Sequence, residues 1–502
     1  MHNHPNVSRT ILLLLGVVFL VGCNAGSKPT PGQTLQPAQP PTTGIAPTSD
    51  KFSTPVEVST PVSQPQVTIP VQPLAATPAQ PLYPLPGIEL SQMDPASLDL
   101  VAQAGAYWIR RNSLLWSVVE PSEGDRNWGA LASFEQELQA ASQRGLQVVL
   151  VVSGTPQWAQ KVPGSFCGPV ADDKLLAFAH FMSDAVKRYS PAPYNIHYFE
   201  IWNEPDIAPN KVAPDSIYGC WGDDTDAYYG GGYYAEMLKQ VYPQVKAADP
   251  QAQVLVGGLL LDCDPVNPPV GEQCIPAGYL EGILRSGGGD FFDGVSYHAY
   301  DFYAGPFEYG NQNWNSNWDS SGPVVIAKAR FLRSVLAAYH HPEKYLLNTE
   351  SGILCGRTDS EPQCQSDEFA STKAAYVAEV NVVGLAESLR ANIWYSLTGW
   401  RGTALVDEQG KPNSSYTAFQ FSSTQLKGAA FVRNIPDYPG VRGYEFLRDG
   451  KKMYFLWSLD KKPQPVLFDR IPDAIFDVFG QALQLEMTIQ VTQQPIYVEW
   501  AP

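Results

Sequence analysis

The sequence predicts a (β/α)8 barrel that is followed by a small antiparallel β domain and preceded by a segment that does not fold. Three observations support this prediction. Apolar, strand-like runs alternate with helix-length segments between residues 88 and 420, closely spaced strands follow residue 425, and 15 of the 44 prolines lie in residues 24–86. The chain of 502 residues is long enough for more than one domain, and its 44% hydrophobic residues can fill a sizeable core.

Residues 1–23 are predicted to be a targeting signal. The apolar run at residues 11–20 is too short to cross a bilayer but fits the central part of a signal peptide. The tetrapeptide LVGC that ends at Cys23 resembles the lipobox of bacterial lipoproteins, in which the chain is cut before a lipidated cysteine. The resemblance implies a lipid anchor on Cys23 and a protein outside the cytoplasm, at the cell surface or in the periplasm. An ordinary signal peptide with an incidental cysteine is the alternative.

Residues 24–86 are predicted to be a disordered linker. They are rich in Pro, Thr, Ser and Gln and carry few charges, so they cannot bury enough apolar surface to offset the entropy of ordering. A proline-rich chain favours an extended conformation at about 3.1 Å per residue, so the linker could hold the folded part on the order of 100 Å from the membrane.

Residues 87–425 are predicted to form the barrel. The eight candidate strands are continuous apolar runs, as expected for parallel strands that are buried on both faces. They lie at 87–90, 107–111, 146–154, 196–205, 252–261, 292–300, 344–353 and 391–400. Six intervening segments have helical spacing of apolar residues. These segments are 95–106, 134–145, 172–189, 231–250, 327–339 and 372–390. No glycine-rich phosphate turn follows the first strand, which argues against an open nucleotide-binding sheet.

Residues 426–502 are predicted to form the antiparallel β domain. Asp449-Gly450 lies between two strand-like runs and is a typical hairpin signal. Aromatic residues in the second run, Tyr454, Phe455 and Trp457, are expected in the core of this domain and not as sugar platforms.

The net charge argues against one class of partner. A net charge of −17 disfavours binding to nucleic acid.

Without Cys23, six cysteines remain, an even number that favours three disulfides in an oxidising compartment. Of fifteen possible connectivities we predict the short loops Cys263–Cys274 and Cys355–Cys364, which leaves Cys167–Cys220. No CxxC or HExxH spacing is present, so no metal site and no cofactor are predicted.

Two glutamates follow predicted barrel strands. Glu204 ends the fourth strand and Glu350 ends the seventh, and active sites of such barrels lie at the carboxyl ends of the strands. Alone, Glu204 could be a buried ion-pair partner and Glu350 a helix cap. Together they predict an active site.

The motifs around these glutamates resemble those of a known clan. Asn203-Glu204-Pro205 and the TESG motif at 349–352 look like the retaining glycoside hydrolases on (β/α)8 barrels, which include cellulases, mannanases and β-xylosidases. Further matching motifs lie at 116–121, 155–159, 296–300 and 393–395. The C-terminal β module is similar to the accessory β-sandwich of the β-xylosidase-like families.

The resemblance implies a role for each of five residues. Glu350 would be the nucleophile and Glu204 the acid/base, with carboxyl groups about 5–5.5 Å apart. Proximity to Glu350 is expected to raise the pKa of Glu204. Asn203 would hold the sugar 2-hydroxyl, and His298 and Tyr300 would orient the nucleophile.

The resemblance also implies an arginine beneath the nucleophile and aromatic platforms for the sugar. Arg110 and Arg111 are both candidates for the arginine, since spacing does not distinguish them. Sugars present flat apolar faces on which aromatic rings stack. Trp394 on the eighth strand is the first candidate platform, and Trp158 is the second.

The sequence therefore predicts a retaining glycosidase that hydrolyses O-glycosidic bonds of a poly- or oligosaccharide and is tethered to the cell surface. Two alternatives remain. One is a carbohydrate-binding lipoprotein without catalysis, against which the intact pair of glutamates argues. The other is a transglycosylase that passes the glycosyl group to another sugar in wall remodelling.

Overall fold

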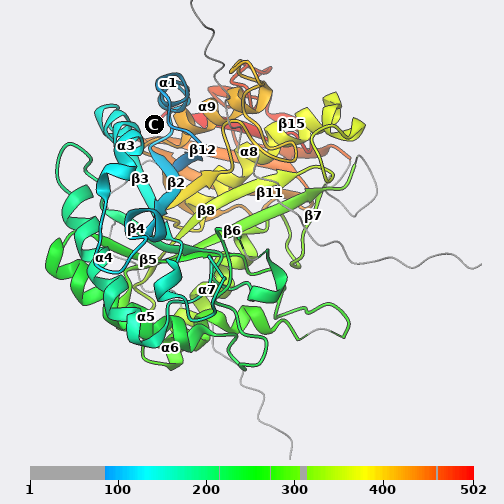
Figure 1. The fold of residues 1–502 in the computed structure, drawn as a ribbon. Helices are drawn as coiled ribbons and strands as arrows, with labels where there is room; N and C mark the ends of the chain where they lie inside the picture. Colours follow the sequence, from blue (N-terminus) through cyan, green and yellow to red (C-terminus); the bar gives the residue numbers. More distant parts are fainter. Residues whose placement is uncertain (1–84, 214, 272, 306–313, 460–461) are drawn as a thin grey trace, which may run out of the picture. The chain divides into compact units, whose positions relative to one another are not determined.

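Eight parallel strands close into a barrel in the computed structural model, as predicted (Figure 1). The structure describes residues 85–502 except 214, 272, 306–313 and 460–461, so the predicted signal segment, Cys23 and almost all of the predicted linker lie outside it. The barrel strands are β1 (Pro86–Glu89), β2 (Trp108–Leu115), β3 (Gln147–Ser153), β4 (Tyr198–Asn203), β5 (Gln253–Leu259), β6 (Gly294–Tyr303), β8 (Tyr345–Leu354) and β9 (Ala391–Trp394). The ring closes because β1 pairs with both β2 and β9.

The strand labels of the barrel skip β7, because β7 is a short strand outside the ring of eight. β7 (Trp314–Asn315) pairs antiparallel with the end of β6, so β8 and β9 are the seventh and eighth strands of the barrel. The carboxyl ends of β4 and β8 are thus the ends of the fourth and seventh barrel strands, where the two glutamates were expected.

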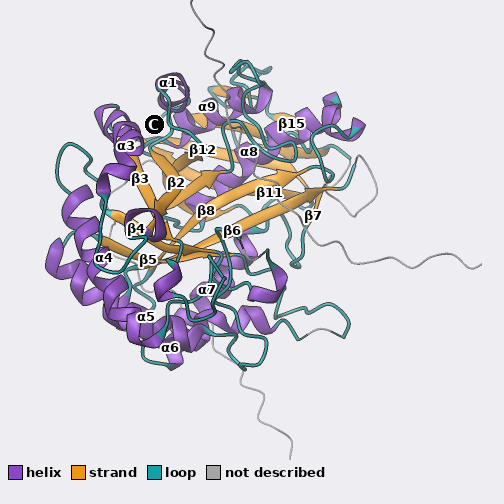
Figure 2. Cartoon of the chain, in the orientation of Figure 1, coloured by secondary structure: helices purple, strands orange, loops and turns teal. Residues whose placement is uncertain are grey.

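Helices surround the strands (Figure 2). They are α1 (Pro95–Gln103), α2 (Trp116–Val119), α3 (Ala132–Gln143), α4 (Leu175–Tyr189), α5 (Gly231–Ala248), α6 (Tyr279–Arg285), α7 (Val325–Ala338), α8 (Asp367–Ala386) and α9 (Ser414–Leu426). All six predicted helices are present. Three further helices were not predicted: α2 and α6 are too short, at four and seven residues, to show a helical period, and α9 is rich in Ser and Thr.

The interior of the barrel begins with an apolar layer. Trp108 and Tyr198 meet edge to face, with ring centroids 4.8 Å apart, and Leu255 and Leu347 belong to the same buried cluster. Side chains of a strand alternate between its faces, so the residue two positions further along each strand also points inward. This rule places Arg110 and Glu200 directly above the apolar layer, both with 0% exposure.

The C-terminal β domain consists of two antiparallel sheets. The larger one contains β10 (Ala430–Asn434), β11 (Val441–Arg448), β12 (Lys451–Ser458), β14 (Ala474–Phe476) and β16 (Ile496–Trp500), and the smaller one β13 (Gln464–Leu467) and β15 (Thr488–Val491). The predicted hairpin joins β11 to β12. Asp449 and Gly450 have φ values of 50° and 78°, as the mirror-image turns of tight hairpins require.

The larger sheet is buried on both faces. Phe455 and Trp457 on β12 belong to the core shared with the barrel helices, whereas Tyr454 and Leu456 belong to the core between the two sheets. The exposed fractions of Tyr454, Phe455 and Trp457 are 8%, 1% and 2%, which confirms the predicted core role. Gln494 fixes the same interface by donating to the hydroxyl of Ser371 on α8 at 2.8 Å.

The three predicted disulfides are present. Cα–Cα distances are 5.5 Å for Cys167–Cys220, 5.2 Å for Cys263–Cys274 and 5.5 Å for Cys355–Cys364. These distances lie within the usual range for a disulfide.

Among the described helices, none combines the length and the apolar character that a membrane span requires.

We expect Trp457→Ala to lower the free energy of unfolding by about 3–5 kcal/mol, because a buried indole between the barrel and the β domain is replaced by a cavity. Urea unfolding followed by circular dichroism measures this. Leu467→Ala is the control in the same domain, since its side chain is 62% exposed and its loss should change the free energy by less than about 0.5 kcal/mol. Equal effects of the two substitutions would contradict the packing described.

Candidate active site

A buried guanidinium organises the centre of the barrel. Nε and Nη2 of Arg110 both donate to Oε1 of Glu200, at 3.1 and 2.6 Å, and Nη2 also donates to Oδ1 of Asn203 at 2.6 Å. Nη1 donates to Oε2 of Glu89 at 2.9 Å and to Oε1 of Glu350. A guanidinium has five N–H donors, and these contacts use all five. Arg110 therefore holds the site together and has no donor left for a sugar.

Strand alternation decides between the two arginines. Arg110 points into the barrel together with Trp108, whereas Arg111 points outward and forms an ion pair with Glu137 on α3 at 3.2 Å. The guanidinium of Arg111 also lies 5.5 Å from the ring centroid of Phe134. The structure therefore places Arg110 beneath Glu350 and places Arg111 between the barrel wall and a helix.

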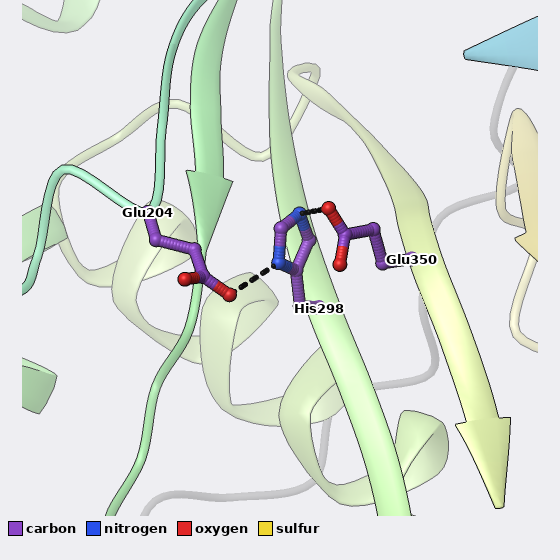
Figure 3. A group of neighbouring side chains, drawn as sticks. All are labelled: Glu204, His298 and Glu350. Carbon is purple, nitrogen blue, oxygen red and sulfur yellow. Dashed lines mark hydrogen bonds and ion pairs between the residues drawn. The ribbon is translucent and has the colours of Figure 1, made fainter. Parts of the chain in front are cut away.

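The two predicted catalytic glutamates lie on either side of one histidine (Figure 3). Nδ1 of His298 is 2.9 Å from Oε1 of Glu204, and its Nε2 is 3.4 Å from Oε1 of Glu350. One ligand-type atom from each of the three side chains lies within 4.8 Å of the others. Burial lowers the pKa of His298 to about 4, so its ring is neutral at neutral pH.

This trio is the one cluster in the described part of the chain whose atoms could hold a metal ion. The two ring nitrogens of His298 face different carboxyl groups, so one ion cannot lie between the ring and both glutamates (Figure 3). Arg110 beside Glu350 adds a positive charge that disfavours a cation. The arrangement suits hydrogen bonding better than metal binding.

Both oxygens of Glu350 are held in place. Oε1 accepts from Arg110, and Oε2 accepts from the hydroxyl of Tyr300 at 2.5 Å. Burial raises the pKa of Tyr300 far above its usual value, so the phenol is a hydrogen-bond donor throughout the physiological range. His298 and Tyr300 are two residues apart on β6 and therefore share a face, which brings both to Glu350 as expected.

An irregularity in β8 aims Glu350 into the site. Tyr297 of β6 pairs with Asn348, but the next pair is His298 with Glu350, so Thr349 has no partner on β6. Such an extra residue bends a strand and redirects its side chains.

Glu204 follows the end of β4 in an unusual backbone conformation. Its φ is 50°, that of Trp202 is 73°, and its N–H donates to the carbonyl of Gly258 at 3.0 Å. Positive φ at non-glycine residues costs free energy and is concentrated at functional sites. The conformation fixes the direction of the Glu204 side chain, of which 14% is exposed.

Burial raises the pKa of Glu204 to about 7, against the opposing charge of Arg110 and with a contribution from Asp262. The raised pKa agrees with the prediction, but its main cause differs. The expected cause was the charge of Glu350, whereas the largest cause in the structure is burial of the Glu204 carboxyl group.

Gly258 leaves the space that the imidazole occupies. A Cβ at this position would lie 2.2 Å from Nε2 of His298, and the fully buried ring has no room to move. Gly258 is not among the residues selected from the sequence, although a glycine pair near the end of an apolar strand is the signal for such a close approach.

The predicted platform Trp394 lies away from any exposed surface. Only 1% of it is exposed, and its indole N–H donates to the carbonyl of Thr403 at 2.8 Å. This placement argues against a stacking role for Trp394. The next residue, Tyr395, is half-buried, and its ring centroid is 6.1 Å from that of Tyr300. Tyr395 lies in the matching motif at 393–395 but was not among the platforms predicted from the sequence.

The second predicted platform, Trp158, lies after β3. Its indole N–H donates to the carbonyl of Glu120 at 3.0 Å, and its ring packs edge to face against Trp116 at 5.1 Å. It is half-buried, so stacking of a sugar on Trp158 stays a prediction.

The loop after β4 is held to the end of that strand and to the loop after β3. Gly219 N–H donates to the carbonyl of Asn203 at 2.9 Å, and Cys220 is joined to Cys167 in the loop after β3. Tyr218 in this loop is half-buried, and burial together with the charge of Glu204 raises its pKa. Tyr218 is not among the candidate residues named from the sequence, although it lies two residues before Cys220.

Several solved structures share this fold. A family 39 glycoside hydrolase from the gut symbiont Bacteroides cellulosilyticus WH2 is 20% identical, with a TM-score of 0.61 over 82% of this chain and 80% of that one. A GH30 endoxylanase from Clostridium papyrosolvens C71 is 14% identical, with a TM-score of 0.53 over 84% and 96% of the two chains. At these identities the likeness establishes the fold. No protein-family model matches the sequence, and no curated protein is significantly similar to it.

We expect Gly258→Ala to lower the free energy of unfolding by about 1–3 kcal/mol, because the new methyl group overlaps the buried ring of His298. Chemical denaturation measures the change. Gly278→Ala is the matched control, since a Cβ there meets its nearest atoms at 3.7 Å, an ordinary contact distance. A Gly258→Ala protein as stable as the Gly278→Ala protein would show that the imidazole does not fill this space.

Proposed function

We propose that the protein is a retaining glycoside hydrolase in which Glu350 is the nucleophile and Glu204 the general acid and base. The observation that carries the proposal is the pair of carboxyl groups in opposite environments. An oxygen of Glu204 and an oxygen of Glu350 lie within 4.8 Å, which suits the spacing of about 5–5.5 Å in retaining enzymes better than the about 6.5–9.5 Å of inverting ones.

The environments suit the first step. Arg110 and Tyr300 hold Glu350 as a carboxylate that can attack the anomeric carbon. Glu204 is protonated below pH 7 because burial raises its pKa, so it can give its proton to the leaving oxygen as the glycosidic bond breaks. The products of this step are the free aglycone and an ester between the sugar and Glu350.

In the second step Glu204 reverses its role. Esterification removes the charge of Glu350, and Glu204 takes a proton from a water molecule that attacks the same carbon. The ester bond breaks, Glu350 leaves as a carboxylate, and two inversions give net retention. In the proposed reaction Asn203, held by Arg110, contacts the 2-hydroxyl of the sugar.

The comparisons support this class of activity. Two solved structures with the same fold are described as a family 39 glycoside hydrolase and a GH30 endoxylanase. We propose a poly- or oligosaccharide substrate on that basis.

We also propose that the protein acts outside the cytoplasm, anchored through a lipid on Cys23. The LVGC motif supports the anchor. The three disulfides support an oxidising compartment, because disulfides seldom persist in the cytosol.

We expect Glu350→Ala to abolish hydrolysis of aryl β-glycosides, with a loss of at least about 10⁴-fold in kcat, because the covalent step is lost. Added azide should restore turnover of substrates with activated leaving groups and give a glycosyl azide of inverted configuration. Glu343→Ala, just before the same strand, is the control, since that side chain is 63% exposed. Unchanged hydrolysis by the Glu350→Ala protein would contradict the proposal.

The pH dependence of kcat/KM should report Glu204. Because the protonated form is needed, kcat/KM should stay level below the pKa of about 7 and fall about tenfold per pH unit above it. In Glu204→Gln this alkaline limb should disappear, and activated aryl glycosides should retain far more activity than unactivated ones. Rate profiles for both proteins measure this. An alkaline limb that persists in Glu204→Gln would assign it to another group.

A further inference from the structure

Three carboxyl groups share the Arg110 guanidinium, but the proposed reaction uses only one of them. Glu350 is the nucleophile. Glu89 on β1 and Glu200 on β4 accept from the same guanidinium and have no assigned role. Glu89 and Arg110 are direct neighbours in the register of β1 and β2, so their contact follows from the strand pairing.

Glu89 and Glu200 differ in their access to the site. The side chain of Glu200 is 0% exposed, whereas that of Glu89 is 10% exposed, close to the 9% of the nucleophile Glu350. Oε2 of Glu89 accepts from Arg110, and Oε1 has no hydrogen-bond partner among residues 85–502 as far as they are described. Oε2 of Glu200 also has no hydrogen-bond partner, but that side chain is fully buried, so of the two residues only Glu89 presents an unengaged oxygen at the accessible side of the site.

Charge balance indicates the protonation state of Glu89. One guanidinium charge faces three carboxyl groups in a buried site, so full ionisation of all three would leave two uncompensated negative charges. Burial, with the charge of Glu350 added, raises the pKa of Glu89 to about 8 although Arg110 opposes this. Glu89 is therefore a neutral acid at neutral pH and can both donate and accept a hydrogen bond.

The barrel order separates Glu89 from the proposed acid/base, Glu204, and brings it nearer to the nucleophile. Glu204, which protonates the leaving oxygen, follows β4, and β2 and β3 separate β4 from β1. Between β1 and the strand of Glu350 there is only β9. The hydroxyls of a pyranose that lie away from the anomeric leaving group are those on carbons 3 and 4.

We propose that Glu89 is a specificity residue that binds the 3- or 4-hydroxyl of the sugar attached to Glu350. This inference rests on the proposed glycosidase activity. The structure assigns the substrate class accordingly: a glycoside whose reacting ring carries a free hydroxyl at the contacted position. Tyr395 follows β9, and burial, with smaller contributions from the nearby Glu89 and Glu350, raises its pKa.

The test combines substitutions with deoxygenated substrates. The best aryl β-glycoside for the wild-type protein and its 3-deoxy and 4-deoxy analogues are compared by kcat/KM. For the wild-type protein one of the two analogues should be about 10- to 100-fold slower, because the hydrogen bond is lost and its protein partner is left buried. We call this loss of kcat/KM on removal of the hydroxyl the deoxy penalty. For Glu89→Ala the deoxy penalty should shrink to less than about twofold, since the partner of the hydroxyl is gone.

Glu200→Gln is the matched control. It disturbs the same guanidinium from a position that a sugar does not reach, so kcat/KM should fall for all substrates while the deoxy penalty stays at its wild-type size. Glu89→Gln should also keep the penalty, because an amide can donate to a hydroxyl as the neutral acid does. If Glu89→Ala fails to fold, Glu89→Asp, which withdraws the carboxyl by one methylene, should show a reduced penalty.

The outcomes separate this inference from the proposed function. A wild-type protein that hydrolyses no glycoside would overturn both. An active protein whose deoxy penalty is unchanged in Glu89→Ala, or is lost equally in Glu200→Gln, would overturn the role of Glu89 alone and leave the glycosidase in place.

Discussion

The arrangement of the site depends on one buried cation. Arg110 has no contact with solvent, and its five donors are shared among side chains from β1, β4 and β8. A buried charge is tolerated only when it is paired, and loss of one partner typically costs about 3–5 kcal/mol. The carboxyl groups and the amide around Arg110 therefore stabilise the arrangement of β1, β2, β4 and β8 at the centre of the barrel. The position of the nucleophile is part of that arrangement.

Arg110 also makes the surroundings of two chemically identical side chains, Glu350 and Glu204, differ. Glu350 lies against Arg110 and accepts from Tyr300, which stabilises its carboxylate form. Glu204 lies on the other side of the His298 ring, where burial raises its pKa more than the charge of Arg110 lowers it, so the acid form is favoured. His298 stays neutral between them, so it adds no charge that would cancel this difference. A base-like and an acid-like carboxyl group thus coexist within 4.8 Å, as the proposed double displacement requires.

The sequence predicted what depends on pattern and left out what depends on side-chain direction. Alternating apolar runs predicted the barrel, and strand ends predicted Glu204 and Glu350. Short cysteine loops predicted two disulfides, and the third followed. Whether Arg110 or Arg111 lies beneath Glu350 depends on the face of β2 that each residue occupies, and a shift of one position reverses that face. In the same way the burial of Trp394 beside the half-buried Tyr395 follows from side-chain direction, which the apolar pattern does not contain. The redirection of Glu350 by the unpaired Thr349 leaves no periodic signal at all.

In the proposed reaction Glu350 forms a covalent bond with the sugar. A 2-deoxy-2-fluoro β-glycoside with an activated leaving group slows the second step more than the first and lets the intermediate accumulate, and peptide mass spectrometry then locates the label. We expect one glycosyl group per protein, on the peptide that contains Glu350, with the label removed on incubation with an acceptor sugar. Turnover of the same glycosides without any label on Glu350, and release of the product as the opposite anomer, would contradict it.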